Sequence, residues 1–251
     1  MDNSFPRRLT ALCLIACLAA FPASGQEQTG SAPADLEAPH APIPKPRPRR
    51  TESDAVAAPP DAVAAPPRPA LPLAERQCRA ALRQAGATFT NEPRVHEPDD
   101  GCLIDHPVML SDLGNGVALE PAALLACPIA RATVEFMRDQ VDPAAERHLS
   151  SAPRALLQVS AYVCRTRHGT DTISQHALGN ALDWVAIVLD DGKTIEVRAQ
   201  GPEAAAEQDF LDEIREAACG PFSTVLGPGT DAAHADHFHF DVADRNSAYC
   251  R

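Results

Sequence analysis

Apolar and polar residues alternate with helical and strand-like periods over residues 71–251. The segments 73–86 and 202–220 carry apolar residues every three or four positions and each ends in glycine, which is typical of amphipathic helices and their C-termini. A longer helix is expected after Pro128, because apolar residues at helical spacing share one face there: Ala130, Val134, Met137 and Val141.

Shorter apolar stretches between these helices predict strands. The sequence ALDWVAIVL at 181–189 is rich in β-branched residues, and the DDGK after it predicts a hairpin that returns along 194–199. Further strands are expected at residues 101–110, 154–164, 222–227 and 237–242. Since helices and antiparallel strands mix without a regular βαβ order, the expected fold class is α+β, with a small antiparallel sheet flanked by helices.

Residues 1–25 have the pattern of a secretory signal peptide: two arginines, then an apolar stretch, then small residues before Gly25. Cleavage after Gly25 is the favoured interpretation. The alternative is a lipoprotein signal, in which the LIAC sequence at 14–17 makes Cys17 the acylated first residue. Only this alternative attaches the protein to a membrane. Both predict export, to the periplasm or the cell envelope.

The next segment, residues 26–70, is rich in proline and alanine and repeats the sequence DAVAAPP at 54–60 and 61–67. It has too little bulky apolar surface to offset the entropy of ordering it, so we expect a disordered tether. Residues 71–251 then form one globular domain, which is long enough for a single core.

Charge and cysteine content limit the possible partners. The formal net charge of −12 argues against a nucleic-acid partner, because phosphate binding relies on clustered Lys and Arg. The cysteines beyond the signal segment form no CxxC pair, and in an exported chain they predict three disulfides. The sequence predicts no oligomeric state. We expect nearest neighbours to pair: Cys78 with Cys102, Cys127 with Cys164, and Cys219 with Cys250.

Two candidate metal ligands lie in the sequence SQHALGNALD, residues 174–183. His176 is in the loop that leads into the strand at 181–189, and Asp183 is on that strand. Gly179 gives the loop the backbone freedom to fold His176 back over Asp183. The two side chains are therefore expected to share one ion.

A further ligand is expected from HADHFHFD, residues 234–241. Because side chains alternate along a strand, His237, His239 and Asp241 share one face while the phenylalanines between them face the core. A neighbouring antiparallel strand that carries Asp183 would add a carboxylate to these imidazoles. Two histidines, one aspartate and an open position for water form the ligand set of a catalytic zinc site.

The two sequences fit the motifs SxHxxGxAxD and HxH, which are shared by the lysostaphin, D-alanyl-D-alanine carboxypeptidase and hedgehog superfamily of zinc proteins. Residues 71–251 as a whole resemble the bacterial extensin-like C-terminal domain, which belongs to that superfamily. The resemblance implies that His176, Asp183 and His239 bind Zn²⁺. It does not extend to the tether.

The resemblance also suggests a general base. Carboxypeptidases of the superfamily have an acidic base three positions before the last ligand, where this chain has Asp236. A regular strand would direct Asp236 away from His239, so a bend is needed near His237. The alternatives are His237, which would hydrogen-bond the oxyanion of the tetrahedral intermediate, and His234, which would orient water. Both would otherwise support the ligands.

Arg165 and Arg167 are candidate substrate-binding residues, because a guanidinium group binds a carboxylate well. In carboxypeptidases of the superfamily an arginine often follows an aromatic residue directly. Here Val163 and Cys164 intervene after Tyr162, which departs from that pattern.

The resemblance implies a function as well as a site. It predicts an exported zinc-dependent peptidase that acts on peptidoglycan peptides, either as an endopeptidase or as a carboxypeptidase. The alternative is a non-catalytic cell-wall-binding or structural protein that uses the same fold.

Overall fold

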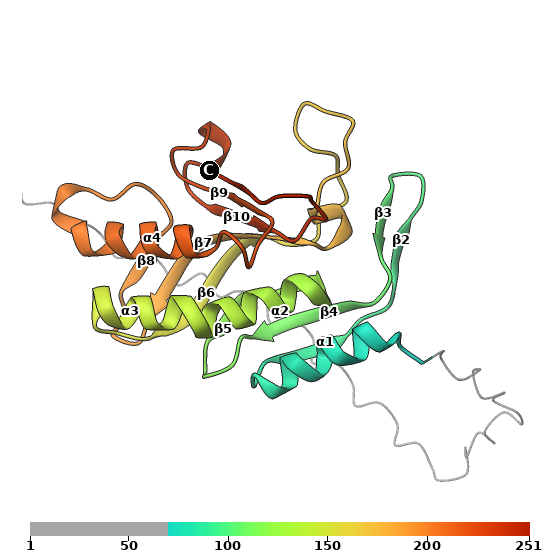
Figure 1. The fold of residues 1–251 in the computed structure, drawn as a ribbon, viewed down its shortest axis with the longest axis horizontal. Coiled ribbons are helices and arrows are strands. Elements are labelled where there is room, and N and C mark those ends of the chain that lie inside the picture. The colour runs from blue at the N-terminus through green and yellow to red at the C-terminus, as the bar shows by residue number, and fades with distance from the viewer. Residues whose placement is uncertain (1–69) are drawn as a thin grey trace, which may run out of the picture. The chain divides into compact units, whose positions relative to one another are not determined.

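The described part of the chain is a mixed α+β fold around one large sheet (Figure 1). The structure is a computed structural model, and it describes residues 70–251. The predicted signal peptide, Cys17 and residues 26–69 of the predicted tether lie outside the described residues. Within the described residues, no helix is both long and apolar enough to cross a membrane.

The elements follow one another in a mixed order. The helical segments are α1 (Leu73–Gln84), α2 (Cys127–Phe136), the π-helical turn η1 (Met137–Val141), α3 (Asp142–Leu149), η2 (His176–Leu178), η3 (Pro202–Ala204), α4 (Ala205–Ala217) and η4 (Ala232–His234). The strands are β1 (Thr88–Asn91), β2 (Val95–Glu97), β3 (Cys102–Ile104), β4 (Pro107–Asp112), β5 (Ala118–Ala126), β6 (Pro153–Ser160), β7 (Ala181–Leu189), β8 (Thr194–Glu196), β9 (Thr224–Leu226), β10 (Phe238–Asp241) and β11 (Tyr249–Cys250).

The α+β class is confirmed, but the expectation of a small antiparallel sheet is wrong. The main sheet has nine strands in the order β1-β4-β5-β6-β7-β10-β9-β11, with β8 paired to β7. Two pairings are parallel, β5 with β6 and β9 with β11. Strands β2 and β3 form a separate hairpin.

The unpredicted strand β5 accounts for much of this difference. Its sequence ALEPAALLA has no β-branched residue and contains Pro121, and both features disfavour a strand. Tertiary packing outweighs these local preferences, because Leu119 and Leu125 are buried in the core. Strand β5 joins β4 to β6 and so connects the N-terminal half of the sheet to the half that carries the candidate site.

The helix predicted after Pro128 is confirmed. Helix α2 begins at Cys127 with Pro128 in its first turn, where the missing N–H has no intrahelical partner to lose. It continues through η1 into α3, and Figure 1 shows α2, α3 and α4 along one face of the sheet. The residues predicted to share one face are all buried: Ala130, Val134, Met137 and Val141.

Aromatic side chains fill the space between β10 and these helices. Phe240 packs edge to face on Trp184 with ring centroids 5.0 Å apart, and it stacks on Phe222 at 4.7 Å. Phe238 and Phe240 are both buried, so the alternation of β10 places His239 on the opposite face. Burial of each phenylalanine stabilises this orientation by about 1.5–3 kcal/mol.

Of the predicted disulfides, Cys219 with Cys250 is confirmed and the other two pairings are wrong. The structure pairs Cys78 with Cys127 and Cys102 with Cys164. Neighbours in sequence do not pair here because helix α1 packs against α2, and hairpin β2–β3 lies beside the segment that follows β6.

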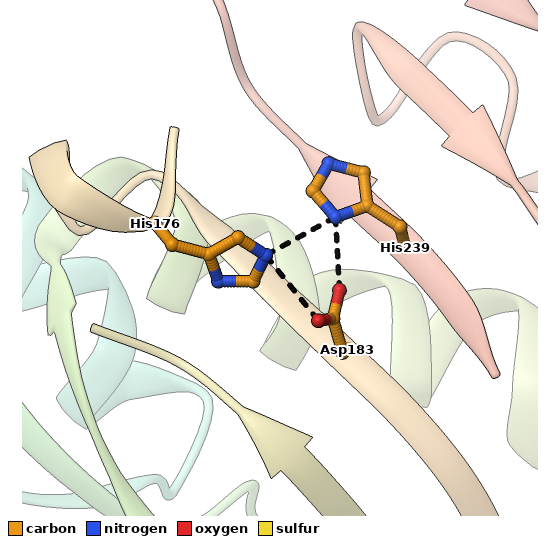
Figure 2. Close-up of side chains that lie close together, drawn as sticks. All are labelled: His176, Asp183 and His239. Atoms are coloured by element: carbon orange, nitrogen blue, oxygen red, sulfur yellow. Dashed lines mark hydrogen bonds and ion pairs between the residues drawn. The ribbon is translucent and has the colours of Figure 1, made fainter. Parts of the chain in front are cut away.

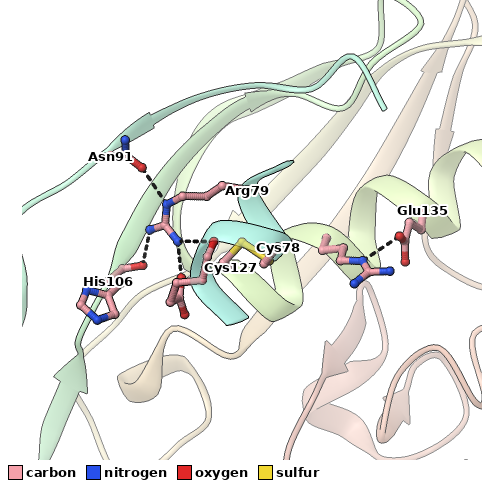
Figure 3. The surroundings of a disulfide bond; sticks show 8 residues. Cys78, Arg79, Asn91, His106, Cys127 and Glu135 are labelled. Carbon is pink, nitrogen blue, oxygen red and sulfur yellow. Dashed lines mark hydrogen bonds and ion pairs between the residues drawn. A yellow bond between two sulfur atoms is a disulfide. The ribbon is translucent and has the colours of Figure 1, made fainter. Parts of the chain in front are cut away.

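A buried arginine supports the first of these contacts (Figure 3). Arg79 of α1 is 2% exposed, and it donates hydrogen bonds to Asn91 Oδ1 at 2.8 Å and to His106 O at 2.9 Å. Its guanidinium group also forms an ion pair with Glu75. A buried charge needs such partners, so Arg79 fixes α1 against β1 and the start of β4 beside the disulfide of Cys78.

Hairpin β2–β3 is joined to the segment between β6 and η2 at two points. One is the disulfide of Cys102 with Cys164. The other is the hydrogen bond that Tyr162 Oη donates to Glu97 Oε1, at 2.7 Å. The same segment leads into the candidate site, so the hairpin helps to position it.

Candidate metal centre

His176 is held at the end of a tightly turned segment. The short helix η2 closes at Gly179, whose φ of +65° is in the left-handed region that favours glycine. Gly179 O accepts a hydrogen bond from Ala126 N at 2.8 Å, which ties this turn to β5. The His176 ring is fixed as well, because its Nδ1 donates to Ala161 O at 2.6 Å. His176 therefore presents Nε2 to the sheet.

Asp183 and His239 lie directly opposite each other in the antiparallel pairing of β7 with β10. His239 Nδ1 is 2.8 Å from Asp183 Oδ1, and His176 Nε2 is 3.3 Å from Asp183 Oδ2. The two imidazole nitrogens are 3.2 Å apart. Figure 2 shows the three side chains converging from three separate segments. The structure thus brings together the three residues predicted as ligands, with donor atoms within 4.8 Å of one another.

The centre is largely withdrawn from solvent, and its charges are coupled. Burial on its own would raise the pKa of Asp183, but hydrogen bonds from His176 and His239 outweigh burial and hold that pKa well below its usual range. Burial on its own would lower the pKa of His239, but hydrogen bonds to Asp183 and Asp241 raise it to about 9.

The donor set fits a divalent cation. Two imidazole nitrogens 3.2 Å apart repel each other when both carry protons, whereas one cation can accept both lone pairs. Histidine nitrogen and aspartate oxygen are typical zinc ligands, and catalytic zinc sites have three protein ligands with a further position open. His176, Asp183 and His239 are therefore the residues that could hold the metal.

A second group of potential ligands does not fit a metal. Glu97, Asp100 and Cys164 lie within reach of one another, but Cys164 is in a disulfide and has no thiolate to offer. Both carboxylates are exposed. These three residues lie close together because the disulfide of Cys102 with Cys164 joins hairpin β2–β3 to the segment after β6.

The predicted general base, Asp236, does not reach the three ligands. Its side chain is 83% exposed, and its Oδ1 lies 3.1 Å from Nδ1 of His237. Strand β10 begins only at Phe238, so His237 precedes the regular strand. The His237 side chain is 16% exposed, which leaves it as the more enclosed member of the pair.

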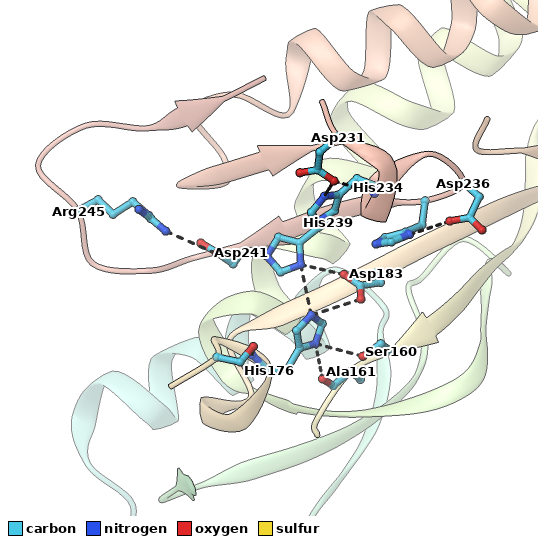
Figure 4. Close-up of polar contacts among 12 residues, drawn as sticks. Ser160, Ala161, His176, Asp183, Asp231, His234, Asp236, His239, Asp241 and Arg245 are labelled. Atoms are coloured by element: carbon cyan, nitrogen blue, oxygen red, sulfur yellow. Dashed lines mark hydrogen bonds and ion pairs between the residues drawn. The ribbon is translucent and has the colours of Figure 1, made fainter. Parts of the chain in front are cut away.

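His234 also lies above the centre (Figure 4). Its ring centroid is 6.0 Å from that of His239 and 5.2 Å from that of His237. Asp231 holds it in place, because Asp231 Oδ1 lies 2.7 Å from His234 Nδ1 and accepts hydrogen bonds from the backbone of η4. His234 and His237 each have a carboxylate partner at Nδ1.

The predicted substrate-binding arginines lie on the exposed segment between β6 and η2. Arg165 O accepts a hydrogen bond from Ser174 N at 3.1 Å, which brings this segment alongside the entry to His176. The Arg165 guanidinium group donates only to Thr166 O, at 3.4 Å, among the described residues. Arg167 is exposed. The structure does not bring either guanidinium group into contact with the three candidate ligands.

Two contacts in the centre were not predicted from the sequence. The carbonyl of Ala161 fixes the His176 ring, and no sequence signal identifies a backbone acceptor fifteen residues away. Asp241 Oδ2 lies 3.3 Å from His239 Nε2. Asp241 was predicted to lie on the ligand face, so its position carried a signal, but no role was assigned to it.

A comparison with models of protein families identifies the family of the chain. The family model described as "Extensin-like protein C-terminus" matches residues 76–251. The chain belongs to this family. The extensin-like match includes all three candidate ligands and all three disulfides. The comparisons with curated proteins and with solved structures give no significant match. The wider resemblance to zinc peptidases stays a prediction.

Proposed function

We propose that this extensin-like protein is an exported zinc-dependent peptidase that hydrolyses peptide bonds of bacterial peptidoglycan. The observation that carries the proposal is the convergence of His176, Asp183 and His239, which offer two nitrogens and one carboxylate to a single point. A bound zinc ion in such a set would lower the pKa of bound water from its bulk value to about 7 and polarise a carbonyl group.

The chain's own residues suggest how a proton would move. His237 Nδ1 is paired with Asp236, and no hydrogen bond from the described residues occupies His237 Nε2. This nitrogen would accept a proton from water and pass it to the leaving amine. Asp236 would then act through His237 by holding the orientation of its ring. The contacts therefore support His237 as the base in preference to Asp236.

The remaining residues suggest how a substrate would bind. His234 lies beside His237 and would hydrogen-bond the carbonyl oxygen of a bound peptide. Arg165 and Arg167 lie on the exposed segment next to His176, where they would attract the carboxylates of peptidoglycan peptides. The three disulfides are consistent with export to an oxidising compartment such as the periplasm.

A second candidate function is a non-catalytic cell-wall-binding or structural protein. One observation favours it: the Asp236 carboxylate is 83% exposed and contacts His237, so the acidic base of related carboxypeptidases is not at the centre. In this alternative a metal would only cross-link β7, β10 and η2.

Elemental analysis of the purified protein, together with a digest of muropeptides, separates these candidates. The variants are His176→Ala and His239→Ala, and the matched control is His96→Ala on the exposed face of β2. About one zinc per chain, lost in the first two variants together with peptide release and kept in the control, would support the peptidase. Zinc without any cleavage would support the non-catalytic protein. Absence of zinc from the parent protein would contradict the metal site.

A further inference from the structure

We infer that Asp241 is a positioning residue that fixes the ring of His239, so that Nδ1 rather than Nε2 faces the candidate zinc site. The inference rests on the ligand set proposed above and extends it by one residue. It concerns how the site is preorganised, and it assigns a function to a buried carboxylate that the proposed reaction does not use.

The contacts of His239 divide between its two nitrogens (Figure 4). Nδ1 lies 2.8 Å from Asp183 Oδ1 and 3.2 Å from His176 Nε2, on the side of the candidate metal. Nε2 lies 3.3 Å from Asp241 Oδ2, on the opposite side. In His176 the roles of the two nitrogens are exchanged: Nδ1 donates to Ala161 O, and Nε2 faces the candidate metal. Each ligand imidazole thus has a protein acceptor at the nitrogen that faces away from the site.

Asp241 is itself held firmly. It is 2% exposed, and its Oδ1 accepts a hydrogen bond from Ala243 N at 3.0 Å. Arg245 Nη2 lies 3.9 Å from its Oδ2 and partly balances the buried charge. Residues two apart on a strand share a face, so the sequence HxD places this carboxylate next to the imidazole of His239.

This arrangement determines which nitrogen can bind a metal. A neutral imidazole carries one N–H, and the nitrogen without it has the lone pair that a metal needs. A carboxylate acceptor at Nε2 keeps the proton there, which leaves the lone pair of Nδ1 directed at Asp183 and His176. It also increases the basicity of the ligand, and loss of such a partner lowers metal affinity by about 10–100-fold.

The test measures zinc affinity by competition with a chelator for the parent protein, Asp241→Asn and Asp241→Ala. The matched control is Asp244→Ala, which removes an exposed carboxylate three residues further on. We expect Asp241→Ala to weaken zinc binding by about 10–100-fold and Asp241→Asn to weaken it less, because an amide oxygen can still accept from Nε2. The control should bind zinc as the parent does.

A second measurement distinguishes positioning from general support of the fold. Long-range proton–nitrogen spectra of the zinc-loaded protein, labelled with ¹⁵N-histidine, report which ring nitrogen carries the proton. In the parent we expect the His239 proton on Nε2. In Asp241→Ala we expect the His239 signals to broaden or to change tautomer while those of His176 stay unchanged, because the partner of His176 is a backbone carbonyl. A merely structural residue would disturb both histidines.

The outcomes separate this inference from the proposed function. Zinc in the parent, bound as tightly by both Asp241 variants with unchanged His239 spectra, would overturn the inference and leave the zinc site standing. A parent protein without zinc would overturn both. If Asp241→Ala does not fold, Asp241→Asn decides: weaker zinc binding than the parent supports the inference, and unchanged binding overturns it.

Discussion

His239 lies directly opposite Asp183 in the antiparallel pairing of β10 with β7, and His239 Nδ1 is 2.8 Å from Asp183 Oδ1. A shift of one residue in this pairing would turn the histidine to the other face, because side chains alternate along a strand. The register is fixed by the burial of Phe238 and Phe240 on the core face. The same alternation that builds the core therefore builds the candidate metal centre.

The turn at Gly179 predicts an effect on His176. A Cβ at this position would contact the Ile104 side chain and lie 3.0 Å from Ala126 N, and the φ of +65° adds strain for any other residue. We expect Gly179→Ala to destabilise the protein by about 2–4 kcal/mol, as the sum of overpacking and left-handed backbone strain. It should also lower zinc affinity, because η2 must move. Chemical denaturation and chelator competition measure the two effects.

Gly192→Ala is the matched control for this prediction. Gly192 also has a positive φ, of +88°, but nothing lies within 4 Å of a Cβ there. The control should lose about 1–2 kcal/mol from backbone strain alone and keep the zinc affinity of the parent. Equal losses of stability and affinity in the two variants would contradict the role of close packing at Gly179.

The disulfide of Cys102 with Cys164 is expected to matter more for the site than that of Cys219 with Cys250. In the chain-entropy account each bridge stabilises the fold by about 4 kcal/mol. Only the first joins hairpin β2–β3 to the segment whose Ala161 carbonyl holds His176. We expect double serine substitution of the first pair to lower zinc affinity, and the same change in the second pair to lower only thermal stability.

Peptide mapping under non-reducing conditions should first establish the disulfide connectivity, before the serine variants are compared. It should recover three linked peptide pairs, joining Cys78 with Cys127, Cys102 with Cys164 and Cys219 with Cys250. Recovery of Cys78 linked to Cys102, or of Cys127 linked to Cys164, would contradict the first two connections.

The phenol of Tyr162 is expected to lose its proton at a higher pH than an ordinary tyrosine. Burial, followed by the hydrogen bond to Glu97 and the charges of Glu97 and Asp100, raises the pKa of Tyr162 from 10.0 to about 12. Because the folded pKa is the higher one, this contribution to stability is present below pH 10 and is lost as the pH rises through about 12. An absorbance titration in a Tyr249→Phe background, which leaves one tyrosine, measures it directly.

Glu97→Gln tests the cause of this shift. The variant removes the charge next to the phenol and keeps a hydrogen-bond acceptor, so the pKa of Tyr162 should fall towards its ordinary value without reaching it. A parent protein in which Tyr162 already titrates near 10.0 would show that the hairpin is not joined to the β6–η2 segment in this way.

Local sequence patterns predicted the parts of the structure that local forces determine. Strand alternation predicted that His239 faces away from the core, and one glycine turn predicted that His176 lies near Asp183, because both depend on local geometry alone. The choice of His239 as the third ligand came from the resemblance to the HxH motif. The helix that begins at Cys127 was likewise visible in its apolar spacing.

Features that depend on the packing of distant segments were missed. Strand β5 carries a proline and several alanines, and it becomes a strand because Leu119, Ala123 and Leu125 are buried in the core. The cysteine pairing failed because it depends on which elements meet in space, as Cys78 and Cys127 do where α1 packs on α2. Strand β10 begins at Phe238, one residue later than expected, and Asp236 lies before it with its side chain 83% exposed.

His237 and Asp236 offer the sharpest test of the proposed chemistry. If His237 takes the proton, His237→Ala should lower kcat by about 10²–10⁴-fold while zinc content is unchanged. Asp236→Ala should have a smaller effect, because its carboxylate is exposed and would act only through the imidazole at 3.1 Å. Steady-state rates on a defined peptidoglycan peptide, with zinc content measured on the same samples, give the comparison.

The double variant, Asp236→Ala with His237→Ala, tests whether Asp236 acts through His237. If Asp236 acts through His237, removing the carboxylate from a protein that already lacks the imidazole should cause no further loss, so the two effects should be strongly non-additive. If Asp236 were instead the base, Asp236→Ala alone would show the larger loss. His237→Ala would then retain most of the rate. Asp99→Ala, in the exposed turn of hairpin β2–β3, is the matched control for removing a surface carboxylate.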